Sequence, residues 1–293
     1  MTLDPGKGLT SSSLTTHDGR QLRYVHGGDG GPVVVFEAGL GSCAGHWVTT
    51  QRLVSEHTKA VSYDRAGHGG STPDTQPRSL ARICEDLDAL VQVVSPDQGI
   101  VLVGHSWGGP ILRCFSATHP DRVAGLVLID TSTTANFPPK AAKRMPASMN
   151  VVRLLGKAGI SAPILRKSFF KHVGPEVTPE DRDIMDRDLT SRTSALAAVG
   201  EARAIFPSLP LMAQWERDGL PDVPVINLMG AGTGPGAKLR AKFIADVEKE
   251  MANHPQGECR VISGTDHFVA QDKPTETAKA ILDVVERVRA KRS

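Results

Sequence analysis

The sequence predicts an α/β fold in which a mostly parallel sheet is flanked by helices and a helical cap is inserted into the chain. Three observations predict it. Apolar runs with strand character alternate with helical segments from residue 9 to about 130, and the same alternation returns after about residue 216. A proline-rich stretch without a strong strand separates the two parts. Alternation of this kind builds a parallel sheet that helices cover on both faces.

The elements of the first part follow from periodicity and turn residues. Segments 9–16 and 21–25 are extended and flank Asp18-Gly19, a dipeptide typical of hairpin turns. Residues 80–94 carry apolar side chains at helical spacing. The other strands are expected at 32–36, 59–63, 100–103 and 123–129, and the other helices at 46–55 and 110–118.

The middle of the chain predicts a helical cap at residues 133–215. Prolines interrupt this stretch, and short helix-like pieces such as 149–157 and 181–199 lie between them. A cap of this kind can exclude water from a site and shape its specificity. The sheet resumes with strands at 223–229 and 260–263 and helices at 237–251 and 274–289, so residues 1–132 and 216–293 form the expected core.

The composition narrows the class of partner. Thirty-four basic residues against 32 acidic ones give no electrostatic footprint of nucleic-acid or anionic-membrane binding. The four cysteines lack paired or metal-type spacing, and the N-terminus lacks an apolar signal core. No run reaches the roughly 18 apolar residues of a membrane-spanning helix. We therefore expect a soluble, cytoplasmic protein that acts on a small molecule, with no nucleic-acid partner and no membrane span.

A GxSxG motif at residues 104–108 carries the strongest chemical signal. It follows the apolar run 99–103 and precedes a helix-like segment, so the serine lies on a strand–turn–helix. Such a turn, the nucleophile elbow, lifts the hydroxyl of Ser106 above the sheet edge, and glycines on either side let neighbouring backbone pass closely. The sequence therefore predicts Ser106 as a nucleophile.

Four segments together resemble the α/β-hydrolase fold over roughly residues 15–290. They are EAGLGS at 37–42, YDRAGHG at 63–69, the elbow at Ser106 and GTDHF at 264–268. The resemblance implies a general base in the loop after the last strand, where His267 stands. It also implies an oxyanion hole formed by the backbone amides of Trp107 and Leu40. His46 and Trp47, just past the Leu40 loop, are candidates for the substrate pocket, although Trp47 alternatively fills the core.

The acid that orients the base is predicted less directly. In the commoner pattern of this fold it follows the strand at 223–229, but residues 230–236 are glycine-rich and contain no carboxylate. Some families of the fold take the acid from the end of the preceding strand, where Asp130 stands. Asp130 is therefore the expected third member, with Asp222, Asp266 and Asp272 as alternatives. A structural reading also exists, in which Asp130 only caps the turn.

These residues predict a cofactor-independent serine hydrolase without a metal site, which cleaves a carboxylic ester or a lactone through a Ser-His-Asp triad and an acyl-enzyme. The same triad would also serve a carbon–carbon bond hydrolase, a thioesterase, an iminopeptidase-like enzyme or a perhydrolase. A third hypothesis belongs to another class: a small-molecule receptor on a hydrolase scaffold. Because one fold hosts many reactions, the sequence leaves these alternatives open.

Overall fold

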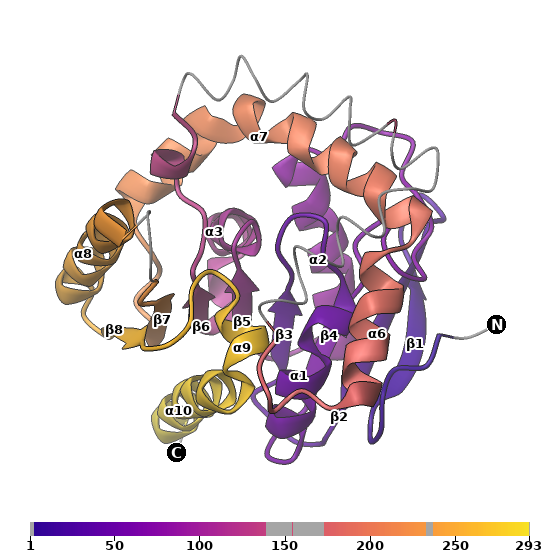
Figure 1. The fold of residues 1–293 in the computed structure, drawn as a ribbon, viewed down its shortest axis with the longest axis horizontal. Helices are drawn as coiled ribbons and strands as arrows, with labels where there is room; N and C mark the ends of the chain where they lie inside the picture. The colour runs from indigo at the N-terminus through magenta and orange to yellow at the C-terminus, as the bar shows by residue number, and fades with distance from the viewer. Residues whose placement is uncertain (1–2, 139–153, 155–172, 233–236, 293) are drawn as a thin grey trace.

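A computed structural model describes residues 3–138, 154, 173–232 and 237–292 of the chain. An eight-stranded sheet forms its centre, in the order β1-β2-β4-β3-β5-β6-β7-β8 (Figure 1). The first two strands and β4 pair antiparallel, and every later neighbour pairs parallel. The predicted fold, a mostly parallel sheet flanked by helices, is confirmed.

The strands lie close to their predicted places. Their bounds are β1 Thr10–Thr15, β2 Gln21–Gly27, β3 Val34–Glu37, β4 Ala60–Tyr63, β5 Ile100–His105, β6 Val123–Ile129, β7 Val225–Gly230 and β8 Gly257–Ile262. The central strands β3, β4, β5 and β7 are buried along their whole length. This matches the continuous apolar runs from which they were predicted, because helices cover both faces of the sheet.

Two apolar layers hold the helices to the sheet. On one face pack α2 (Leu80–Val94) and α3 (Gly108–Thr118), together with α8 (Ala237–Asn253). On the other face pack α1 (Val48–Ser55), the short α9 (Val269–Asp272) and α10 (Pro274–Arg292). The start of α2 is fixed by Ser79, whose side chain accepts a hydrogen bond from the backbone of Arg82. Short 3-10 turns occupy Ala44–Trp47, Pro120–Arg122 and Thr134–Asn136.

Two helices of the segment between β6 and β7 are described, and both differ from expectation. The predicted helix 181–199 is divided into α6 (Pro179–Leu189) and α7 (Arg192–Asp218). Ser191 begins the second helix, since its hydroxyl accepts a hydrogen bond from the N–H of Ser194. The predicted helix 149–157 lies outside the described residues except for Leu154. Figure 1 shows α7 arching across the top of the view, above α3 and α2.

The helix α7 also continues through Pro207 and Pro210, which were expected to interrupt helices, and passes the expected cap boundary at residue 215. A proline inside a helix costs about 3 kcal/mol or more. Burial of a side chain such as Ile205 or Met212 contributes roughly 1.5–3 kcal/mol, and both join the core cluster. Tertiary packing therefore sustains a helix that local propensity alone would interrupt. Among the described residues, none of the helices combines the length and apolar character needed to cross a bilayer.

Candidate active site

Ser106 lies on a sharp turn between β5 and α3. Its φ of 52° is in the left-handed region, which costs a residue other than glycine roughly 1–2 kcal/mol. Backbone hydrogen bonds hold this conformation: the N–H of Ser106 donates to the carbonyl of Ile129 at 3.1 Å, and the N–H of Ser132 donates to the carbonyl of Ser106 at 2.9 Å. Strain held by surrounding structure is common where a side chain is positioned for chemistry.

The loop after β3 passes directly beside this turn. A Cβ on Gly108 would lie 2.5 Å from the carbonyl oxygen of Glu37, so only glycine permits the approach. A Cβ on Gly39 would lie 3.2 Å from Cβ of Ser106. Gly39 therefore lies directly beside Ser106, and Leu40 is the next residue along the chain. The Trp107 side chain is 1% exposed, whereas that of Leu40 is 37% exposed at the edge of the site.

The imidazole of His267 connects Ser106 with Asp130. Its Nε2 lies 3.0 Å from Oγ of Ser106, and its Nδ1 lies 3.2 Å from Oδ1 of Asp130. With a hydrogen on Nδ1, the ring donates to the carboxylate and accepts from the hydroxyl. The structure thus brings the three predicted residues together, although 161 positions separate Ser106 from His267.

Asp130 reaches this position because β6 and β7 are neighbours. Its N–H donates to the carbonyl of Leu228 in β7 at 2.8 Å, and its φ of 47° makes it a second strained residue. Of the alternative acids, Asp222 instead accepts a hydrogen bond from Gln256, and Asp266 is exposed beside His267. Asp272 ends the short helix α9. Asp130 is the carboxylate of these four that lies within hydrogen-bond distance of the His267 ring.

A layer of rings lies behind His267. The Nε2 of His105 lies 2.8 Å from the carbonyl oxygen of His267 and so supports the loop that carries the base. His46 stacks on His105 at 5.5 Å between ring centroids, and Trp47 meets it edge-on at 6.5 Å. Both side chains are buried. The two residues predicted as pocket lining therefore contact the site from behind, and we assign neither a substrate contact.

A buried guanidinium holds the loop that leads to Leu40. Arg65 donates from Nη1 to Glu37 at 2.6 Å and to the carbonyl of Ala38 at 2.7 Å, and from Nη2 to the carbonyl of Gly39 at 2.8 Å. Its Nε and Nη2 also donate to Glu201 in α7 at 2.7 and 2.8 Å. All five N–H groups are thereby satisfied. Nothing near Arg65 in the sequence points to Glu201, which lies 136 positions away.

Burial and charge set the proton affinity of these groups. Burial, and after it the positive charge of Arg240, lower the pKa of His267 from 6.5 to about 4. Burial lowers the pKa of His46 to about 3 and that of His105 well below its usual range. All three rings are therefore neutral at pH 7. A neutral imidazole is the form that can accept a proton from a hydroxyl.

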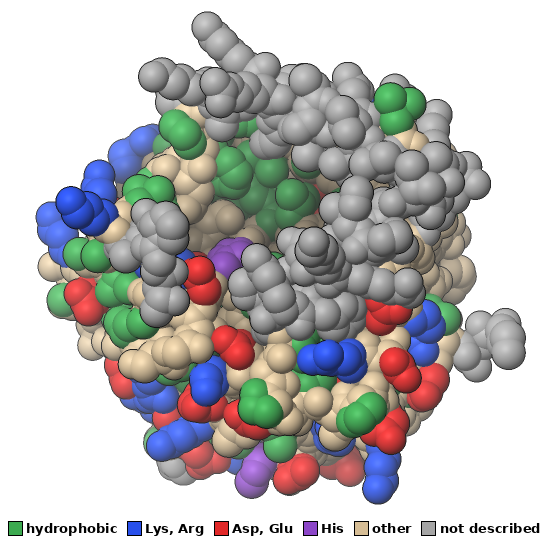
Figure 2. Space-filling view, in the orientation of Figure 1, with side chains coloured by type: hydrophobic (Ala, Val, Ile, Leu, Met, Phe, Trp, Pro, Cys, Tyr) green, Lys and Arg blue, Asp and Glu red, His purple; other side chains and the backbone are tan. Residues whose placement is uncertain are grey.

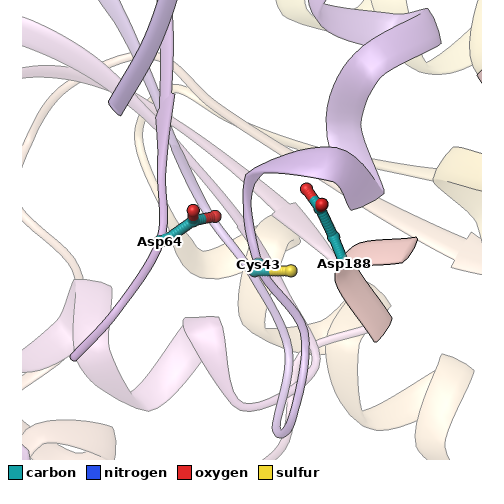
Figure 3. A group of neighbouring side chains, drawn as sticks. All are labelled: Cys43, Asp64 and Asp188. Atoms are coloured by element: carbon teal, nitrogen blue, oxygen red, sulfur yellow. The ribbon is translucent and has the colours of Figure 1, made fainter. Parts of the chain in front are cut away.

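One further cluster joins ionisable side chains away from the serine. Cys43, Asp64 and Asp188 of α6 have side-chain atoms within 4.8 Å of one another, and Figure 3 shows Cys43 and Asp64 turned toward Asp188. Nη1 of Arg23 lies 2.9 Å from Asp64 and 3.8 Å from Asp188, where a cation would have to bind. Burial also raises the pKa of the Cys43 thiol. The donor set therefore fits an ion-paired contact between α6 and the core, not a metal centre.

Comparison with known proteins places the chain in a family. The model described as "Alpha/beta hydrolase family" matches residues 25–280. The probable transporter efuK of Hormonema carpetanum is 24% identical over 269 residues, which are 88% of this chain. The chain spans only 36% of efuK's length. The (lyso)-N-acylphosphatidylethanolamine lipase of Bos taurus is 25% identical over 256 residues, covering 75% of this chain and 73% of the lipase.

Solved structures share the architecture. The epoxide hydrolase VrEH1 from Vigna radiata aligns with a TM-score of 0.76 at 18% identity, covering 96% of this chain and 99% of that one. At this identity the likeness concerns the fold alone. The family model, by contrast, spans most of the sequence and includes the segments that form the site. The protein therefore belongs to the alpha/beta hydrolase family.

Proposed function

We propose that the protein is a serine hydrolase that cleaves carboxylic esters, lactones included, through Ser106, His267 and Asp130. One observation carries the proposal: the unbroken chain of contacts from the Ser106 hydroxyl through the imidazole to the Asp130 carboxylate, at 3.0 and 3.2 Å. Serine at its ordinary pKa is a weak nucleophile and needs a base within hydrogen-bond reach. His267 meets that requirement and Asp130 fixes its tautomer.

In the proposed reaction Ser106 attacks the ester carbonyl while His267 takes the hydroxyl proton. The backbone N–H groups of Leu40 and Trp107 bind the oxyanion that forms, each contributing a factor of about 10²–10³ in rate. The protonated His267 then gives its proton to the departing alcohol, which leaves an acyl-enzyme. Water, deprotonated by His267, releases the acid and restores the serine.

The surroundings favour an apolar acyl group. Figure 2 shows a hollow beneath α7 with hydrophobic side chains in its depth and a histidine at its margin. Phe137 meets Trp107 edge-on at 6.1 Å between ring centroids, and Phe206 of α7 meets Phe137 at 6.3 Å. Phe137 and Phe206 are half-buried, so they offer apolar surface near the oxyanion hole. The bovine relative is a lipase, which favours an acyl ester over other bonds.

The segment between β6 and β7 would act as the cap of this enzyme. Its helix α7 lies over the oxyanion loop, since a Cβ on Gly41 would lie 3.2 Å from Cβ of Ala198. A cap in contact with this loop can select acyl and alcohol groups by shape and exclude bulk water from the acyl-enzyme. We therefore assign specificity to residues of this segment and the chemistry to the core.

A panel of substrates tests the proposal. We expect p-nitrophenyl acetate, butyrate and octanoate to be hydrolysed by the protein, and the longer chains to bind more tightly. Ser106→Ala serves as the control for each reaction. The panel also includes a γ-lactone, an acyl thioester, an aminoacyl p-nitroanilide and styrene oxide. Turnover of the anilide or the epoxide alone would refute the ester assignment, and turnover that persists in Ser106→Ala would refute the mechanism.

A further inference from the structure

Arg240 contacts the carboxylate that faces His267. It lies in the first turn of α8, where its Nη1 donates to Oδ1 of Asp130 at 2.7 Å and its Nη2 donates to Oδ2. Its Nε donates to the carbonyl of Gly230 at 2.8 Å, and the N–H of Gly230 lies 3.3 Å from Oδ2 of Asp130. A bidentate guanidinium fixes both the place and the plane of a carboxylate. Arg240 and the imidazole of His267 therefore share Oδ1 of Asp130, and the guanidinium also binds Oδ2.

The sheet explains why this arginine is there. The strand β7 is paired with β6, so the chain that follows β7 returns past the end of β6, where Asp130 stands. In the commoner pattern of this fold that returning chain supplies the acid. Here it supplies a cation to an acid that comes from β6. The charge balance beside the histidine therefore differs from that of a simple Ser-His-Asp arrangement.

Few charged groups face His267 among the described residues. Asp130 and Arg240 lie on the Nδ1 side, and Asp266 precedes the histidine in its own loop. From β5 the ring of His105 approaches to 4.8 Å between centroids, with His46 stacked behind it, and both of these rings are neutral. The imidazolium would thus be stabilised by Asp266 and opposed by Arg240, while the Asp130 carboxylate lies within hydrogen-bond distance of Nδ1. Because Arg240 is paired with Asp130, it cancels the charge of the nearest anion.

We propose that Arg240 is a positioning residue that holds Asp130 beside His267 and offsets its negative charge, so that the imidazole stays neutral and able to accept a proton in acidic solution. The inference rests on the proposed function, because it concerns the same base. It assigns Arg240 two separable effects. The fork geometry orients the acid, and the charge opposes protonation of the ring. A lysine could supply the second effect without the first.

The test is an NMR titration of His267 between pH 3.5 and 8.5 in the full-length protein. Its imidazole signals are identified by their loss in His267→Asn. The wild type is compared with Arg240→Gln, which removes the charge, and Arg240→Lys, which keeps it. Lys242→Gln is the matched control, because Lys242 is an exposed cation two residues along the same helix. A cavity of about 90 Å³ adjoins Asp130 and Arg240, so the shorter glutamine enlarges an existing space that Asp246 and Glu250 also line.

We expect Arg240→Gln to raise the pKa of His267 by about one pH unit or more, because an unopposed carboxylate within hydrogen-bond distance favours the imidazolium. Arg240→Lys should raise it less, and Lys242→Gln should leave it unchanged. The acid limb of kcat/KM for p-nitrophenyl acetate should move with the NMR value. If circular dichroism shows that Arg240→Gln does not fold, Arg240→Lys is compared with Lys242→Gln instead. A kcat that is reduced tenfold in Arg240→Lys alone, with a near-normal titration of His267, supports the assignment.

Two results would overturn the inference: a His267 that titrates in Arg240→Gln as in the wild type, or an equal change in Lys242→Gln. Failure of the proposed function is seen separately. A wild type that cleaves no ester would refute the ester hydrolase, and the NMR titration would still decide the role of Arg240.

Discussion

Arg65 and Glu201 form a buried, bidentate ion pair that joins the loop after β4 to α7, with N–O distances of 2.7 and 2.8 Å. The same guanidinium binds the carbonyls of Ala38 and Gly39, immediately before Leu40. Burial alone would raise the pKa of Glu201, but Arg65 lowers it below the usual range, so the pair is charged. One side chain thus links the oxyanion loop to the proposed cap.

Glu201→Ala should lower the free energy of unfolding by about 3–5 kcal/mol, because it leaves the Arg65 charge buried without its main partner. Urea denaturation followed by circular dichroism measures the loss. Arg203→Ala is the matched control, since Arg203 is an exposed residue of the same helix and its substitution should change stability by less than about 0.5 kcal/mol. Equal losses in the two variants would contradict the role of the pair.

Substitutions in the triad should act mainly on kcat. Ser106→Ala and His267→Ala should each lower kcat by about 10⁴-fold or more while the protein stays folded. Asp130→Asn should cost less, because the nucleophile and the base remain in place. Asp266→Asn is the control for a carboxylate that adjoins His267 without meeting its ring. Ester turnover by Asp130→Asn near the wild-type rate would move the acid elsewhere.

The activity should persist in acid. His267 has to be neutral to accept the Ser106 proton, and its pKa is lowered from 6.5 to about 4 by burial and by Arg240. The value of kcat/KM should therefore be constant from pH 8 to about 5, and should fall as the pH drops through about 4 and the ring becomes protonated. Return of full activity at pH 7 after each acid incubation controls for unfolding. An acid limb centred at pH 6.5 or above would contradict this assignment.

The free energy of unfolding should fall in acid, because the folded protein holds His46 in its neutral form. The pKa of His46 is lowered to about 3 in the folded protein, so between pH 6.5 and about 3 the unfolded chain binds a proton that the folded one does not. The contribution of neutral His46 to the free energy of unfolding is fully present above pH 6.5. It is lost as the pH falls, by about 2–3 kcal/mol at pH 4.5. The free energy of unfolding of His46→Gln should depend less steeply on pH. The exposed His17→Gln, as control, should retain the wild-type slope.

Much of the fold could be predicted because its signals are local. The strands β5 and β6 are continuous apolar runs, and Ser106 and Asp130 follow directly after them. Asp130 is the expected acid because the glycine-rich stretch after β7 contains no carboxylate. Hydrophobic periodicity and turn residues are sufficient for such elements.

The sequence could not predict the ion pairs that tertiary packing forms between distant residues. Arg65 meets Glu201, 136 residues away, and Arg240 meets Asp130 across the pairing of β6 with β7. A lone arginine carries no local signal of its partner. The long helix α7 was missed for a related reason: Pro207 and Pro210 argue against it locally, and burial of its apolar face against the core prevails.

Covalent labelling tests most directly whether Ser106 is an activated nucleophile. The folded protein is treated with a fluorophosphonate probe at pH 7, and peptides are mapped by mass spectrometry. We expect a single adduct on the peptide containing Ser106, with labelling abolished in Ser106→Ala and slowed at least 100-fold in His267→Ala, because the probe reports an activated hydroxyl. A folded protein that remains unlabelled at Ser106 would show that this serine is not activated, and would favour a receptor built on a hydrolase scaffold.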